Sequence, residues 1–283
     1  MSIERSVIPI HAADGHRFEL LATVPHQPRL RLLWLSALGV PARHYQTLAD
    51  ELATRGVATF LHEWRGIGSS DARAGRENDW GYREILLHDL PASQQAVAAA
   101  CPALSTVVGG HSIGAQFAAL HLALRPASAD ALWLVASGSP YWRNFPAPRR
   151  FLFPLAFRFV PWIADRRGLL HGRKFGFAGN EARTLMRDWA NIGLSNRYAA
   201  AGMDADLELA LADVRGGVRA VLLDDDWFAP RPSLQALLDK MPDAPAQVSV
   251  LDHATLGVRA DHFAWMKQPA GVVDALLADQ ADV

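Results

Sequence analysis

Residues 106–124, TVVGGHSIGAQFAALHLAL, carry the pattern that decides the fold. The first residues are β-branched and apolar, which favours a strand, and the residues after Ser112 follow a helical pattern. Between them, residues 110–114 read Gly-His-Ser-Ile-Gly. A strand that turns this sharply into a helix holds its serine in strained geometry and lifts the hydroxyl away from the sheet. We therefore predict that Ser112 is a nucleophile; the alternative is a chance match in a packing turn.

Strand-like and helix-like stretches alternate on both sides of this turn. Strand patterns cover residues 6–10, 17–23, 30–36, 57–62, 106–109, 131–136, 218–223 and 247–251. Helical patterns cover residues 42–55, 79–100, 112–124, 233–240 and 271–279. This alternation predicts right-handed crossovers and a doubly wound, mostly parallel sheet of the α/β class. Asp14-Gly15 predicts a hairpin that adds an antiparallel edge, and Pro91 allows a break or kink in its helix.

Residues 139–213 interrupt the alternation. Aromatic side chains are frequent in this segment, and no run within it is convincing as a strand. Open α/β sheets bind ligands at the carboxyl ends of their strands. We therefore predict a helical lid over that edge, inserted into a single domain that spans residues 1–283.

The same segment is rich in positive charge. Between Tyr141 and Met203 there are eleven basic and three acidic side chains, a surplus of eight positive charges that the remainder of the chain balances.

The composition of the 283 residues excludes several classes of protein. Half of the residues are hydrophobic, and 28 basic against 29 acidic side chains give no global signal for nucleic-acid binding. The single cysteine, Cys101, excludes a disulfide framework and a multi-cysteine metal site. Residues 1–17 lack the apolar core of a signal peptide, and the apolar stretch 151–164 is too short to span a bilayer. We predict a cytoplasmic protein without stable membrane insertion, nucleic-acid partner, metal or organic cofactor.

A serine hydroxyl is a weak nucleophile that needs a base, which in turn is oriented by a carboxylate. After a strand-to-helix elbow, the acid and then the histidine follow along the chain. Residues 221–230, VLLDDDWFAP, leave a strand into three acids, of which we prefer Asp226 and keep Asp225 as runner-up. For the base we prefer His262 to His253, because a loop before the last helix lets the imidazole reach over the sheet. The alternative for all three acids is a solvated turn.

Two backbone amides are candidates for the site that stabilises an oxyanion. Ile113 follows the serine at the predicted start of a helix, where its N–H points toward developing negative charge. The second donor is expected in the loop after the strand 30–36, where we choose Leu38; an ordinary strand–helix turn is the alternative.

Several segments together resemble the α/β-hydrolase superfamily. They are Ser36–Gly39 (SALG), Arg65–Ser69 (RGIGS), Gly109–Gly114 (GGHSIG), Asp224–Pro230 (DDDWFAP) and Asp261–Trp265 (DHFAW). More narrowly, HEWRGIGSS, SGSPYWRNFP and KFGFAGNEARTLMRDW are similar to bacterial predicted α/β hydrolases, or serine aminopeptidase-like sequences, of unassigned substrate. The resemblance covers nearly the whole chain and implies the α/β-hydrolase fold. Glu63 stands where the superfamily commonly has aspartate, and Asp261 where glycine is frequent.

These features predict a serine hydrolase that cleaves a carboxylic ester through an acyl-enzyme. Ser112 is the nucleophile, His262 its base and Asp226 the orienting acid. Thioesterase, peptidase or acyltransferase chemistry on the same residues is an alternative, as is a binding protein that performs no catalysis. The expected partner is a small-molecule acyl substrate. The arginines of the predicted lid either attract an anionic or lipid-like substrate, for example through carboxylate, phosphate or CoA groups, or lie at an anionic membrane surface. The alternative is that they balance the acidic remainder. Neither the substrate nor the oligomeric state follows from the sequence.

Overall fold

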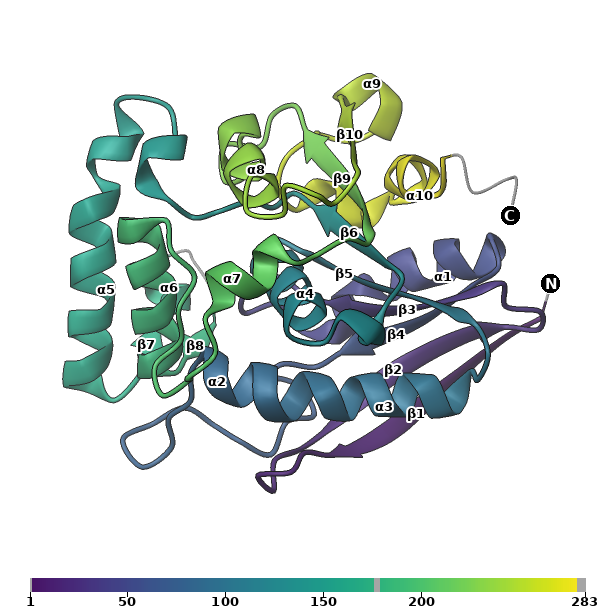
Figure 1. Cartoon of the computed structure of the whole chain (residues 1–283), viewed down its shortest axis with the longest axis horizontal. Helices are drawn as coiled ribbons and strands as arrows, with labels where there is room; N and C mark the ends of the chain where they lie inside the picture. The colour runs from purple at the N-terminus through teal and green to yellow at the C-terminus, as the bar shows by residue number, and fades with distance from the viewer. Residues whose placement is uncertain (1, 176–178, 279–283) are drawn as a thin grey trace.

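Eight strands form one sheet through the centre of the molecule (Figure 1). The computed structural model describes residues 2–175 and 179–278. The strands are β1 (Ile3–His11), β2 (Arg17–Pro25), β3 (Leu30–Leu35), β4 (Val57–His62), β5 (Ser105–His111), β6 (Ala131–Val135), β9 (Gly217–Leu223) and β10 (Ala246–Leu251). Residues 176–178 of the predicted lid and Asp279, the end of the last predicted helix, lie outside the described residues.

The strands lie in the order β1-β2-β4-β3-β5-β6-β9-β10. Every neighbouring pair from β4 to β10 is parallel, whereas β2 is antiparallel to both β1 and β4. The doubly wound, mostly parallel sheet with an antiparallel edge hairpin is therefore confirmed. Because parallel strands end on the same side, the carboxyl ends of β3, β5, β6 and β9 meet at one edge of the sheet.

Helices cover both faces of the sheet (Figure 1). They are α1 (Gln46–Thr54), α2 (Tyr82–Glu84), α3 (Leu90–Ala100), α4 (Ile113–Leu124), α5 (Phe153–Arg167), α6 (Arg183–Ser195), α7 (Leu207–Ala212), α8 (Arg231–Leu238), α9 (His253–Leu256) and α10 (Ala270–Leu277). Short 3₁₀ turns are η1 (Ala42–Tyr45), η3 (Pro126–Ser128), η4 (Trp142–Asn144), η5 (Arg149–Phe151), η6 (Gly172–Phe175) and η7 (Ala264–Lys267). In the part of the chain that the structure describes, no helix has the length and apolar character needed to cross a bilayer.

The hydrophobic core is divided by the sheet. Leu33 and Leu35 of β3 pack with the helices α3 and α4, whereas Leu32 and Trp34 pack with α1 and α10. Successive side chains of a strand point to opposite faces, so a strand that is covered on both sides must be apolar at every position. This explains why residues 30–36 read as a nearly continuous apolar run.

The predicted helix over residues 79–100 contains a wide turn rather than a break. A π-helical turn, η2 (Ile85–Asp89), joins α2 to α3, and Pro91 stands in the first turn of α3. Proline has no N–H to donate, and its ring crowds the carbonyl four residues earlier, here that of Leu87. The wider π turn relieves this crowding and lets the helix continue.

Residues between β6 and β9 form an additional layer at one end of the sheet, where α5 and α6 lie side by side (Figure 1). Between these two helices, β7 (Leu170–His171) and β8 (Asn180–Glu181) pair as a two-residue antiparallel ladder. We expected no strand in this segment. A ladder this short has no periodicity in the sequence, because it forms where the chain reverses between the two helices.

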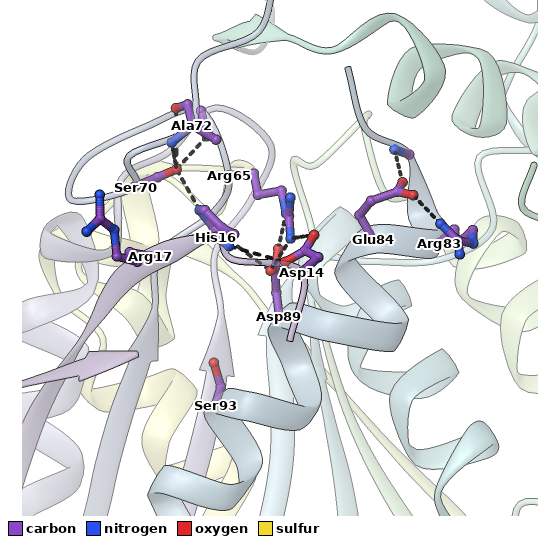
Figure 2. A network of polar contacts seen from close by, with 12 residues as sticks. Asp14, His16, Arg17, Arg65, Ser70, Ala72, Arg83, Glu84, Asp89 and Ser93 are labelled. Atoms are coloured by element: carbon purple, nitrogen blue, oxygen red, sulfur yellow. Dashed lines mark hydrogen bonds and ion pairs between the residues drawn. The ribbon is translucent and has the colours of Figure 1, made fainter. Parts of the chain in front are cut away.

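A buried polar network attaches the β1–β2 hairpin to the rest of the domain (Figure 2). The Asp89 carboxylate lies 2.9 Å from His16 Nδ1 and accepts hydrogen bonds of 2.7 and 2.8 Å from Arg65. On its other side, His16 Nε2 lies 2.8 Å from the Ser70 hydroxyl. Burial by itself raises the pKa of Asp89, but the hydrogen bonds from His16 and Arg65 outweigh it and hold this pKa below its ordinary value.

We expect Asp89→Asn to lower the free energy of unfolding by about 3 kcal/mol, because the buried Arg65 guanidinium loses its main carboxylate partner. Since folding lowers the pKa of Asp89, its contribution is present above pH ~4 and is lost as the pH falls through the folded value. Urea denaturation at neutral and acidic pH measures both effects. The control is Asp71→Asn, which removes an exposed pair with Arg17 and should change stability little. Equal losses of stability in the two variants would contradict the stabilising role of the Asp89 network.

Candidate active site

Ser112 stands in a strained turn between β5 and α4. Its φ of 58° and ψ of −126° lie in a region that residues other than glycine rarely adopt. The Ser112 N–H donates to the carbonyl of Val135 at 3.0 Å, and the Ser112 carbonyl accepts from the Ser137 hydroxyl at 2.6 Å. The end of β6 and the residues after it therefore hold the peptide groups on both sides of the serine.

Glycine is required on both sides of this turn because the backbone of β3 lies against it. A Cβ atom on Gly110 would lie 2.7 Å from the carbonyl oxygen of Leu35 and 2.6 Å from the carbonyl carbon of Gly114. A Cβ atom on Gly114 would overlap the carbonyl oxygens of Leu35 and Ser36. The Gly-x-Ser-x-Gly pattern thus reflects a close approach of α4 to β3.

Two of the predicted site residues, Asp226 and His262, are brought together by the fold. His262 Nδ1 lies 2.7 Å from Asp226 Oδ2, and both residues are buried. The other carboxylate oxygen accepts hydrogen bonds from the N–H groups of Phe228 at 2.8 Å and Ala229 at 3.3 Å. Because a carboxylate only accepts, the proton of the neutral imidazole is assigned to Nδ1, which leaves Nε2 as the basic atom.

Neither competing candidate belongs to the Asp226–His262 pair. Asp225 is exposed and forms an ion pair of 3.1 Å with Arg259. His253 is an exposed residue at the start of α9.

His111, next to the serine, is fully buried. Its Nδ1 atom lies 2.7 Å from the Tyr45 hydroxyl oxygen. Burial lowers the pKa of His111 well below its ordinary value, so this ring is a neutral packing group. It packs 4.7 Å from the His262 ring, measured between centroids. His262 therefore lies directly beside the residue that precedes Ser112.

Leu38 and Ile113, the two predicted backbone donors, line the same cavity as Ser112. In the loop after β3, the Ala37 N–H donates to the Tyr45 hydroxyl at 2.9 Å, and the Val40 N–H donates to the Ala37 carbonyl at 3.1 Å. Since Tyr45 also bonds His111, one hydroxyl connects this loop to the serine turn. Sequence reasoning missed both Tyr45 and Ser137, because a hydroxyl that positions backbone carries no motif.

A cavity of about 510 Å³ adjoins Ser112. Its far wall consists of apolar side chains from α5 and α6, including Phe157, Ile163 and Trp189. Besides Ser112, the cavity has three polar lining residues, none of them charged: Gln116, Ser137 and Ser233. In the described residues, 2–175 and 179–278, no group of three or more His, Cys, Asp or Glu side chains is arranged to hold a metal ion.

Glu181 is a buried acid close to the candidate oxyanion donors. It shares a small cleft with Leu38 and Ile113, and its Oε1 accepts a hydrogen bond of 2.8 Å from the Gly179 N–H. Burial raises the pKa of the Glu181 carboxyl to about 7, because a single backbone donor offsets little of the cost of desolvation. The sequence contained no signal for this residue, since a glutamate in a two-residue strand looks like an ordinary surface acid.

Comparisons with known proteins give the family and the fold. A model of the family described as serine aminopeptidase, S33, matches residues 26–198, which include Leu38 and Ser112 and end before Asp226. No curated protein sequence matches the chain.

Several solved structures are similar over nearly their whole length. The esterase domain of a Rhodothermus marinus protein is 16% identical and superposes with a TM-score of 0.62, covering 98% of this chain and 96% of that one. A thermophilic esterase from Thermogutta terrifontis is 16% identical, with a TM-score of 0.60 and 96% of both chains covered. An N-formylmaleamic acid deformylase from Pseudomonas putida S16 is 17% identical, with a TM-score of 0.60 and coverage of 96% and 100%. These likenesses show the α/β-hydrolase fold.

The buried carboxyl of Glu181 generates a prediction about stability. Because folding raises its pKa from 4.5 to about 7, the native state binds more protons between these values, and stability falls as the pH rises through this window. Glu181→Gln removes the titration. The change in the free energy of unfolding that this substitution causes should therefore be more favourable at pH 8 than at pH 5, by up to about 3 kcal/mol. Urea denaturation at the two pH values measures this, with the exposed Glu77→Gln as control. An identical pH response in the two variants would refute the prediction.

Proposed function

The chain belongs to the serine aminopeptidase (S33) family of α/β hydrolases, and from this premise we propose that it is a serine hydrolase that cleaves carboxylic esters. The hydrogen bond between buried Asp226 and His262, beside the strained turn of Ser112, carries the proposal. This is the set of groups that acyl transfer requires: a nucleophile, a base and an acid that orients the base. A cytoplasmic location belongs to the same proposal.

In the proposed mechanism, the Ser112 hydroxyl attacks the ester carbonyl while His262 Nε2 removes its proton. Asp226 stabilises the imidazolium that forms, and the N–H groups of Ile113 and Leu38 donate to the oxyanion of the tetrahedral intermediate. The imidazolium returns the proton to the leaving alcohol. Water then attacks the acyl-enzyme with the same base, which releases the acid and restores the serine.

The lining of the cavity favours an ester over a peptide with a free amine. Among the described residues, no acidic side chain lines the cavity beside Ser112, so a buried ammonium group would lack a counter-charge there. The apolar wall suits an apolar acyl group instead. The likeness to proteins named as esterases supports the same choice. We propose that residues 139–213 act as the lid that keeps water from this cavity.

Labelling by a fluorophosphonate probe tests the proposal directly, because such probes react with a serine that a neighbouring base activates. We expect the wild-type protein to be labelled and Ser112→Ala to lose the label completely. Ser233→Ala removes a different serine that lines the same cavity and should retain labelling. If the folded wild-type protein is not labelled, the proposal is wrong. Product analysis with and without an added alcohol or thiol then distinguishes hydrolysis from acyl transfer.

The two neighbouring acids provide a matched pair of variants. Asp226→Asn should lower kcat/KM by about a thousandfold or more, because an amide in place of the carboxylate favours the wrong tautomer of His262. Asp225→Asn should change kcat/KM by less than about twofold, since the exposed Asp225 carboxylate pairs with Arg259 and not with His262. Ester hydrolysis at neutral pH measures both values. The reverse ranking would show that Asp225 is the orienting acid.

A further inference from the structure

The outer face of α5 and the turn before it expose four large apolar side chains, which we call the α5 strip. They are Leu152, Leu155, Phe159 and Trp162, with exposed fractions of 67%, 68%, 49% and 50%. Their spacing of three, four and three residues places them on one side of the helix. The opposite side is occupied by buried residues such as Phe157 and Ile163. A contiguous exposed patch of this kind marks an interaction surface.

Arginines border the strip, and Arg158 lines the same groove as Leu155 and Trp162. Five arginines and one acid lie within residues 149–167, and the acid, Asp165, pairs with Arg187 of α6. Arg166 lies over the ring of Trp162 at 4.8 Å, and Arg158 donates to the Pro154 carbonyl of its own helix. In the described part of the chain, these five arginines form no ion pair with a carboxylate. Their charge is therefore available to an external anion.

We propose that the α5 strip docks on the surface of an anionic phospholipid bilayer. Trp, Phe and Leu side chains on one face, flanked by arginines, are suited to the boundary between lipid headgroups and acyl chains. The arginines would lie at the level of the phosphates, to which guanidinium groups donate paired hydrogen bonds. A protein partner would need its own apolar patch surrounded by acids, whereas an anionic bilayer presents both features everywhere.

The position of α5 connects this surface to the candidate active site. Ala156 and Phe159 line the outer groove together with Leu155 and Trp162, and they also line the cavity beside Ser112. One helix thus separates the proposed lipid surface from the cavity. The docking itself does not depend on the proposed ester hydrolysis.

Flotation with vesicles tests the proposal, using the full chain with Ser112→Ala so that no lipid is hydrolysed. Vesicles of phosphatidylcholine with about 30% phosphatidylglycerol should bind the protein, and pure phosphatidylcholine vesicles should bind it at least about tenfold more weakly. Leu155→Asp and, separately, Trp162→Asp should each weaken binding to anionic vesicles by about tenfold or more. Leu209→Asp is the matched control, because Leu209 is 67% exposed on α7, away from the strip, and its change should leave binding unaltered.

Charge reversal tests the electrostatic part separately. Arg158→Glu should weaken binding to anionic vesicles and leave the residual binding to neutral vesicles unchanged, and added salt should act in the same way. Equal effects of Leu155→Asp and Leu209→Asp would overturn the proposal, as would equal binding to neutral and anionic vesicles. Absence of vesicle binding, together with a dimer in sedimentation that Leu155→Asp dissociates, would show that a second copy covers the strip. Fluorophosphonate labelling of the wild-type protein is independent of all these outcomes.

Discussion

The positive φ of Ser112 is the constraint on which the arrangement of the site depends. A strained residue persists only where its surroundings fix it, and here three neighbouring strands do so. β5 carries the serine, Val135 of β6 accepts its N–H, and the backbone of β3 excludes any side chain at Gly110. The order of these strands in the sheet is therefore a condition for the geometry of the serine. A change in strand order would therefore also change the backbone geometry of Ser112.

Two buried Asp–His pairs, Asp89–His16 and Asp226–His262, differ in whether the serine beside them adjoins a cavity. Asp89, His16 and Ser70 form a chain of hydrogen bonds with the same residue types as the proposed catalytic set. The Ser70 hydroxyl, however, is buried and accepts a hydrogen bond from the Ala72 N–H (Figure 2). It also accepts one from the Gly66 N–H. Ser112 instead adjoins a cavity of about 510 Å³. Space for a substrate, more than the residue types, separates the two.

The segment between β6 and β9 combines an apolar inner face, an apolar outer face and a surplus of arginine. The inner face forms the wall of the cavity, which accounts for part of the aromatic content of the segment. The arginines of α5 form no ion pair within that helix, because its Asp165 pairs with Arg187 of α6. The near-neutral charge of the whole chain therefore conceals a basic surface. In α5, one side of the helix forms part of the cavity wall and the other side is the proposed lipid surface.

Elements whose signals are local could be predicted from the sequence. Apolar runs located the eight strands of the sheet, and residues 110–114 located the serine turn, because strand period and turn chemistry act over a few residues. Sequence reasoning preferred Asp226 to Asp225 and His262 to His253, and these choices remain predictions. It did not indicate the β7–β8 ladder, the π turn before Pro91 or the buried state of Glu181. The ladder, the π turn and the burial of Glu181 follow from the tertiary structure alone, because each depends on which distant segment packs against the residue. Packing between segments leaves no pattern within either segment.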